Sequence, residues 1–146
     1  MITRFDVVLG AALLIGMATV AGAQSGNQIS VPIQGLRNNQ GLVRCGLYAS
    51  ADGFRQPGKQ FRGVAVPIAN QQATCVFDNV PPGTYAVAVF HAENNETQLQ
   101  TNFLGQPKEG YGFSRNPSTT FGAPAFGDAA YAYPGGMTSW PVQITY

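Results

Sequence analysis

Apolar and polar residues alternate along several short stretches of the chain with the two-residue period of a β-strand. The period is clear in residues 28–36, 42–49 and 138–146, and it is shorter in residues 62–68 and 73–77. Gly, Pro, Asn and Asp cluster between these stretches at the spacing typical of a β-sandwich. The pattern predicts an all-β fold, an antiparallel β-sandwich.

Residues 84–92 form a strand of a different kind, because both of its faces are apolar. Tyr85, Val87 and Val89 fall on one face, whereas Ala86 and Ala88 fall on the other together with a phenylalanine. A strand that is apolar on both faces is typical of the centre of a sheet that is covered on both sides. The small alanines predict that another segment packs closely on the second face.

Prolines give two further predictions. Pro82 and Gly83 precede the apolar strand, and we expect a type II turn there in which Gly83 supplies the positive φ. Pro141 lies inside the last alternating segment and donates no hydrogen bond to a ladder, so we expect that segment at the edge of a sheet.

The segment 102–134 lacks a clean period, yet it is rich in aromatic residues and glycine. A structureless loop of this length is uncommon in a compact domain, and disordered segments are poor in aromatics. We therefore expect it to wrap a face or an edge of a sheet, with aromatic anchors separated by glycine bends. The aromatic residues are Phe103, Tyr111, Phe113, Phe121, Phe126, Tyr131 and Tyr133.

The first residues read as a targeting signal. Arg4 precedes a short apolar stretch, and Ala21-Gly22-Ala23 provides a small-residue cleavage site. We predict a signal peptide at residues 1–23, a single domain at residues 24–146, and a periplasmic or secreted bacterial protein. An uncleaved amino-terminal anchor is the rival interpretation; after cleavage we expect no insertion into a membrane.

Composition narrows the function classes. The formal net charge is +1 and charged residues make up 10% of the chain, against about 25% in ordinary soluble domains. This balance gives no electrostatic basis for binding nucleic acid, and it is compatible with weak self-association.

Cys45 and Cys75 are the two cysteines of the chain, and both lie in the exported part. Export favours a disulfide, and closing a loop of about thirty residues would contribute roughly 3–4 kcal/mol. Two buried free thiols are the alternative. Two distant cysteines and one histidine make a poor zinc set, so we predict no metal and no cofactor.

A longer set of residues resembles a known family. The stretch from Phe77 to Val87 is similar to the turn-and-strand phrase of transthyretin-like sandwich modules. The phrases that follow, from Phe90 through Ser114 and again at Pro124–Ala129, resemble an exported bacterial family classified as a domain of unknown function, number two-one-four-one. The resemblance implies an Ig-like or prealbumin-like β-sandwich and implies little about activity.

In that family the phrase after the histidine resembles a calcium loop, and this chain departs from it. Asn94 and Glu96 stand at ligand-like places, but Ala92 and Gln100 replace two aspartates and Thr97 replaces the glycine. Calcium requires several charged oxygens and a sharp turn, so we interpret the loop as degenerate. Alternation also predicts that Glu93 and Glu96 point to opposite sides.

His91, the single histidine, ends the apolar strand beside this loop. Such a residue is more often a hydrogen-bonded rim residue than a catalytic base. The other hypothesis pairs it with Glu93 or Glu109, since a carboxylate would orient the ring. No serine has a nucleophile-elbow context, and we assign no catalytic residue.

Tyr111 and Phe113 alternate with glycines, which is typical either of a flat binding platform or of side chains that attach a segment to a sheet. The candidate binding residues are His91, Glu93, Asn94, Glu96, Glu109, Tyr111 and Phe113, and a protein or a carbohydrate is the candidate ligand. We predict a non-catalytic binding or structural module of the bacterial envelope. The alternatives are a small hydrolase or ion-dependent enzyme that uses His91, and a surface subunit that self-assembles through an edge strand.

Overall fold

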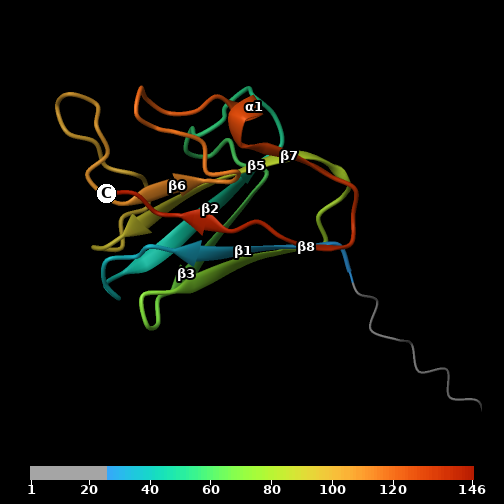
Figure 1. Cartoon of the computed structure of the whole chain (residues 1–146), viewed down its shortest axis with the longest axis horizontal. Coiled ribbons are helices and arrows are strands. Elements are labelled where there is room, and N and C mark those ends of the chain that lie inside the picture. The colour runs from blue at the N-terminus through green and yellow to red at the C-terminus, as the bar shows by residue number, and fades with distance from the viewer. Residues whose placement is uncertain (1–25) are drawn as a thin grey trace, which may run out of the picture.

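The computed structural model describes residues 26–146, which fold into nine strands and one short helix (Figure 1). The predicted signal peptide lies outside these residues. Among them, no helix is long and apolar enough to cross a membrane.

The first sheet is built around β1 (Gln28–Gln34). It pairs antiparallel with β4 (Ala73–Asp78) on one side, with Val31 opposite Cys75. On the other side β1 pairs in parallel with β8 (Met137–Ser139) and β9 (Val142–Gln143). These parallel pairs are the exception in an otherwise antiparallel fold.

The second sheet is built around β5 (Gly83–Ala92). One side of β5 pairs with β2 (Leu42–Tyr48), which in turn pairs with the edge strand β3 (Arg62–Pro67). The other side of β5 pairs first with β7 (Ala130–Tyr133) and then with β6 (Tyr111–Phe113). β5 is therefore central, as its two apolar faces predict.

The core lies between the two sheets and follows from the alternation along the strands. Ile29, Val31 and Ile33 of β1 are buried against Val43 and Leu47 of β2. Burial of a side chain of this size stabilises the fold by about 1.5–3 kcal/mol. The prediction of an all-β sandwich is confirmed.

The predicted disulfide joins the two sheets. Cys45 of β2 and Cys75 of β4 are bonded, with their Cα atoms 6.5 Å apart. Both cysteines are buried in the core, because each lies on the inward face of its strand.

The outer face of the second sheet is covered by the aromatic segment, as expected. Ala86 and Ala88 leave room for a second, smaller apolar cluster, in which Phe54 packs edge-on against Tyr48 with ring centroids 5.3 Å apart. Figure 1 shows α1 (Phe126–Ala129) above β5, on the side of the second sheet away from β1. The segment contributes Tyr111, Phe113 and Phe126 to this cluster.

The predicted turn before β5 is wrong in one respect. The positive φ occurs earlier, at Asn79 (54°). Gly83 begins strand β5, and its φ is not positive. The Tyr85 hydroxyl donates to the carbonyl oxygen of Pro81 at 2.7 Å, and its ring lies 3.2 Å from the place of a β-carbon on Gly83. A β-carbon at this position would therefore be tightly packed against the Tyr85 ring.

The prediction that Pro141 marks an edge agrees with the sheet order, since β8 and β9 border the first sheet on the side of β1 away from β4. Pro141 falls in the gap between β8 and β9, where β1 requires no donor from it. On its other side the same segment bonds Asn116, and Thr145 exchanges two backbone hydrogen bonds of 2.9 Å with Tyr111. The final segment thus connects the two sheets.

Candidate binding pocket at the end of strand β5

The candidate site lies where β5 ends and two polar loops meet it. Residues 35–41 pass close to the end of the strand, and residues 93–110 lead away from it. Gly41 adopts a φ of 67°, and a β-carbon there would lie 1.9 Å from the carbonyl oxygen of Ala92. Only glycine permits both the left-handed conformation and this approach. The first loop is thereby held against the beginning of the second.

His91 is fully buried, and both of its ring nitrogens have partners. Nε2 lies 2.6 Å from the carbonyl oxygen of Gln40, and Nδ1 lies 2.7 Å from the hydroxyl of Tyr146. A carbonyl only accepts, so Nε2 carries a proton and donates it. In the neutral ring Nδ1 then accepts from Tyr146.

Tyr146 completes this arrangement. Its hydroxyl oxygen accepts a hydrogen bond of 3.1 Å from the backbone N–H of Arg37, while the Arg37 guanidinium lies 4.5 Å from the centre of its ring. Burial raises the pKa of Tyr146, so the hydroxyl keeps its proton for His91. The His91 ring therefore connects the first loop to Tyr146, and its hydrogen bonds go to neither Glu93 nor Glu109.

Beside His91 lies a polar pocket of about 390 Å³. Its walls come from the first loop, from the residues directly after β5, and from the segment before β6. The lining residues are Arg37, Gln40, Glu93, Asn94, Glu96, Gln100, Lys108 and Glu109.

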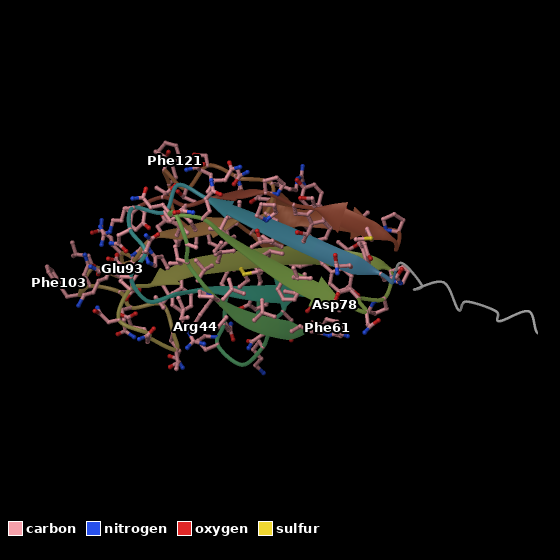
Figure 2. The ribbon with its side chains drawn as sticks, turned by 90° about the horizontal axis from the view of Figure 1, so that it is seen from below. Arg44, Phe61, Asp78, Glu93, Phe103 and Phe121 are labelled. Atoms are coloured by element: carbon pink, nitrogen blue, oxygen red, sulfur yellow. A yellow bond between two sulfur atoms is a disulfide. The ribbon has the colours of Figure 1, made fainter. Side chains whose placement is uncertain are left out.

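Glu93 is the carboxylate that is already neutralised. It forms an ion pair with Arg37 and accepts a hydrogen bond of 3.0 Å from the Asn38 side chain. Partial burial raises its pKa, but the bonds from Asn38 and Arg37 outweigh burial and hold the pKa below its ordinary value. Figure 2 shows Glu93 at the same end of the molecule as Phe103, away from Phe61 and Asp78.

Glu96 lines the same pocket as Glu93, so the prediction that they point to opposite sides is wrong. β5 ends at Ala92, and the turn that follows places Asn95 at a φ of 61°, which breaks the alternation. Burial raises the pKa of Glu96, but backbone hydrogen bonds outweigh burial and hold the pKa below its ordinary value. One of these bonds is the 3.0 Å bond from the Asn94 N–H to the Glu96 carboxylate.

Glu109 has the least favourable environment of the three carboxyl groups. It is 7% exposed, and it accepts a hydrogen bond of 2.8 Å from the backbone N–H of Gln100. Burial raises its pKa, and the nearby carboxylates of Glu96 and Glu93 raise it further. The ionised form of Glu109 is therefore destabilised in the folded protein.

The carboxylates do not form a metal-binding cluster. Within residues 26–146 no group of three or more His, Cys, Asp or Glu side chains is placed to hold a metal ion. This agrees with the interpretation of the loop as degenerate, in which Thr97 and Gln100 stand at places where the resemblance implies a glycine and an aspartate.

Two candidate residues lie elsewhere. Tyr111 and Phe113 belong to the apolar cluster on the outer face of the second sheet, with their rings 6.0 Å apart. The Tyr111 hydroxyl donates to Thr119 at 3.3 Å. Neither residue lines the pocket, and both attach the aromatic segment to the sheet.

Half of the pocket was not predicted by the sequence analysis. Arg37 and Gln40 come from the loop before β2, and Gln100 and Lys108 come from the segment before β6. The polar run of residues 37–40 is the one signal in the sequence that could have indicated the first pair. The second pair carries no such signal.

Fold and pocket together define a class of protein: a small disulfide-linked β-sandwich with a polar pocket at the end of one central strand. A family model described as "Uncharacterized protein conserved in bacteria (DUF2141)" matches residues 31–139. The chain belongs to this family, which confirms the resemblance found in the sequence. No curated protein and no solved structure is significantly similar to the chain.

Proposed function

We propose that this protein is an exported, non-catalytic binding module of the bacterial envelope, and that its pocket accepts the basic side chain of a protein or peptide ligand. Export is supported by the predicted signal peptide and by the disulfide, because disulfides persist in oxidising compartments. The ligand class follows from the charges in the pocket.

The observation that carries the proposal is the position of Glu109. A buried carboxyl group beside two other carboxylates destabilises a fold, and such groups concentrate at functional sites. A ligand with an ammonium or guanidinium group would neutralise this excess of negative charge. The free protein is therefore arranged to favour a cation.

The other charges agree with one positive guest. Arg37 neutralises Glu93, which leaves Glu96 and Glu109 facing Lys108 in the pocket. Two carboxylates against one ammonium leave a net negative charge. A volume of about 390 Å³ lies within the range of small-molecule sites and accommodates one long side chain.

The non-catalytic part of the proposal is supported by the surroundings of His91. Its side chain is buried, and its two ring nitrogens are engaged with Gln40 and Tyr146. A general base needs access to the proton that it removes. A hydrolase built on His91 would first have to break both hydrogen bonds.

The test is titration calorimetry of the exported, processed protein with N-acetyl-lysine methylamide, with N-acetyl-glutamate methylamide as the probe of opposite charge. We expect the lysine probe to bind and the glutamate probe to fail. Glu109→Gln and Glu96→Gln should each weaken binding, and Lys108→Gln should strengthen it. Asp52→Asn removes an exposed carboxylate outside the pocket and serves as the matched control.

Equal binding of the two probes, or equal loss in the Asp52 variant, would contradict the proposal. Calcium binding tighter than about 100 μM would instead indicate an ion site. Hydrolysis of either probe would support the alternative that the protein is a hydrolase.

A further inference from the structure

Two loops end in apolar side chains that belong to no core cluster and line no part of the pocket. Phe103 is 95% exposed and Leu104 is 67% exposed, and Phe121 on the second loop is fully exposed. Phe103 and Phe121 are aromatic residues of the long segment that do not anchor it to the sheet, contrary to expectation. Figure 2 shows Phe103 and Phe121 projecting from the periphery of the molecule, away from the labelled Phe61 and Asp78.

The loop that carries Phe103 and Leu104 is a small hairpin with a fixed tip. Thr101 and Pro107 form a bridge, and the Asn102 side-chain oxygen accepts from the backbone N–H groups of Leu104 (2.9 Å) and Gln106 (3.0 Å). Because Asn102 organises the turn internally, Phe103 and Leu104 are held outward rather than folded back. Their exposure is therefore built into the hairpin.

The loop that carries Phe121 is fixed at its base. The Asn116 side chain donates to the carbonyl oxygen of Pro141 at 3.3 Å and accepts from the backbone N–H of Gln143 at 2.8 Å. A turn between Thr119 and Gly122 then presents Phe121. In Figure 1 the two loops, gold and orange, project from the same upper left part of the molecule.

Neither loop carries a charge. Residues 97–107 and 116–127 contain no Asp, Glu, Lys or Arg, and the side chains that flank the apolar tips are amides and hydroxyls. Uncharged polar groups can form hydrogen bonds at the level of the lipid headgroups. The apolar tips could therefore enter the apolar layer without desolvating an ion.

We propose that these two loops, with Phe103, Leu104 and Phe121 at their tips, bind a lipid surface. The tips are convex and belong to separate loops, so a protein partner would need a matching cavity for each of them. A lipid layer accepts separate protrusions without such complementarity. The uncharged flanks fit a surface recognised by apolar contact rather than by charge.

The contact is peripheral. Only side chains at loop tips would enter the interface, which narrows the expectation of no insertion to the body of the domain. It is also independent of the pocket, since none of the three tip residues lines it.

The test is co-sedimentation of the exported, processed protein with phosphatidylcholine vesicles and with vesicles that also contain phosphatidylglycerol. We expect binding to both. The double variant Phe103→Ser/Leu104→Ser and the single variant Phe121→Ser should each lower the partition coefficient by about tenfold or more, since burial of one large apolar side chain corresponds to at least that factor. Circular dichroism should show an unchanged fold.

Met137→Ser is the matched control, because Met137 is 65% exposed but lies on β8, outside both loops. It should bind as the parent protein does, and so should the pocket variant Glu96→Gln. Failure of the parent protein to bind either vesicle would overturn the proposal in favour of a protein partner. Binding that survives the loop substitutions, or that Met137→Ser reduces equally, would overturn it as well.

Discussion

The core between the sheets and the pocket at the end of β5 are formed by the same central strand, but they differ in what they do for stability. In the core, Val87 and Val89 of β5 pack against other apolar side chains, and a disulfide crosses the space between the sheets. In the pocket, a few residues further on, three carboxyl groups are gathered and one of them is buried.

The difference separates two kinds of polar group near the end of one strand. His91 is buried with both ring nitrogens satisfied, so it stabilises the fold. Glu109 is buried beside like charges, so its ionised form destabilises the fold. A structural residue and a residue of the proposed binding site therefore lie next to each other, and substitutions should separate them by the sign of the effect on stability.

The largest effect should come from the core. Phe77 is the largest of the fully buried side chains, and Phe77→Ala should lower the free energy of unfolding by about 3–5 kcal/mol. Urea denaturation followed by circular dichroism measures this. Phe103→Ala removes the same atoms from an exposed tip and should change stability by less than about 0.5 kcal/mol. Similar losses in both variants would mean that the two phenylalanines do not differ in burial as described.

Loss of the disulfide should have the next largest effect on stability. Replacing Cys45 and Cys75 together by alanine should lower the free energy of unfolding by about 3 kcal/mol, because the unfolded chain loses a constraint on a loop of 30 residues. Thermal unfolding of the double variant, compared with the oxidised parent protein, measures the effect. An unchanged melting temperature would contradict the connection of the sheets through this bond.

His91→Ala should lower the free energy of unfolding by about 2–3 kcal/mol, because the buried ring and its part-buried hydrogen bonds to Gln40 and Tyr146 are lost. Tyr146→Phe should lose about 1 kcal/mol, since the ring stays. Denaturant titrations at pH 7 compare the two. A His91 variant with full stability that no longer binds the ligand would move His91 from structure to function.

The smallest effects should have opposite signs within the pocket. Glu109→Gln keeps an acceptor for the Gln100 N–H and removes the repulsion, so it should raise the free energy of unfolding by about 0.5–1 kcal/mol at pH 7. Glu93→Gln breaks the pair with Arg37 and should lower it by about 0.5–1 kcal/mol.

The pH dependence distinguishes these two variants further. The folded pKa of Glu109 is raised, so its penalty is complete above that pKa and disappears as the pH falls below the unfolded value. The folded pKa of Glu93 is lowered, so its contribution is complete above the unfolded value and is lost as the pH falls through the folded pKa. Stability measured between pH 3 and pH 7 should therefore show the two variants converging on the parent protein from opposite sides.

Most strands of this fold could be predicted because alternation is a local property. The stretch 28–36 alternates, and it becomes β1 with its apolar side in the core. The turn before β5 was misinterpreted because its positive φ falls at Asn79, whereas Gly83 lies in the strand and is approached by the Tyr85 ring.

The candidate site was predicted only in part. Glu93, Asn94 and Glu96 stand together in the sequence, so their grouping was visible. Arg37 and Lys108 are distant from them in the chain and reach the pocket only because β2, β5 and β6 are neighbours in one sheet. Tyr146, which completes the surroundings of His91, is more distant still.

The sequence by itself determined the all-β class, most of the strands and the pair of cysteines, because strand period and residue type are properties of neighbouring residues. The tertiary structure alone decided that His91 is buried with two partners, that Glu109 lies beside Glu96, and that Phe103 and Phe121 face outward. These facts depend on which distant segments meet, and that depends on the order in which the strands pair rather than on any local pattern.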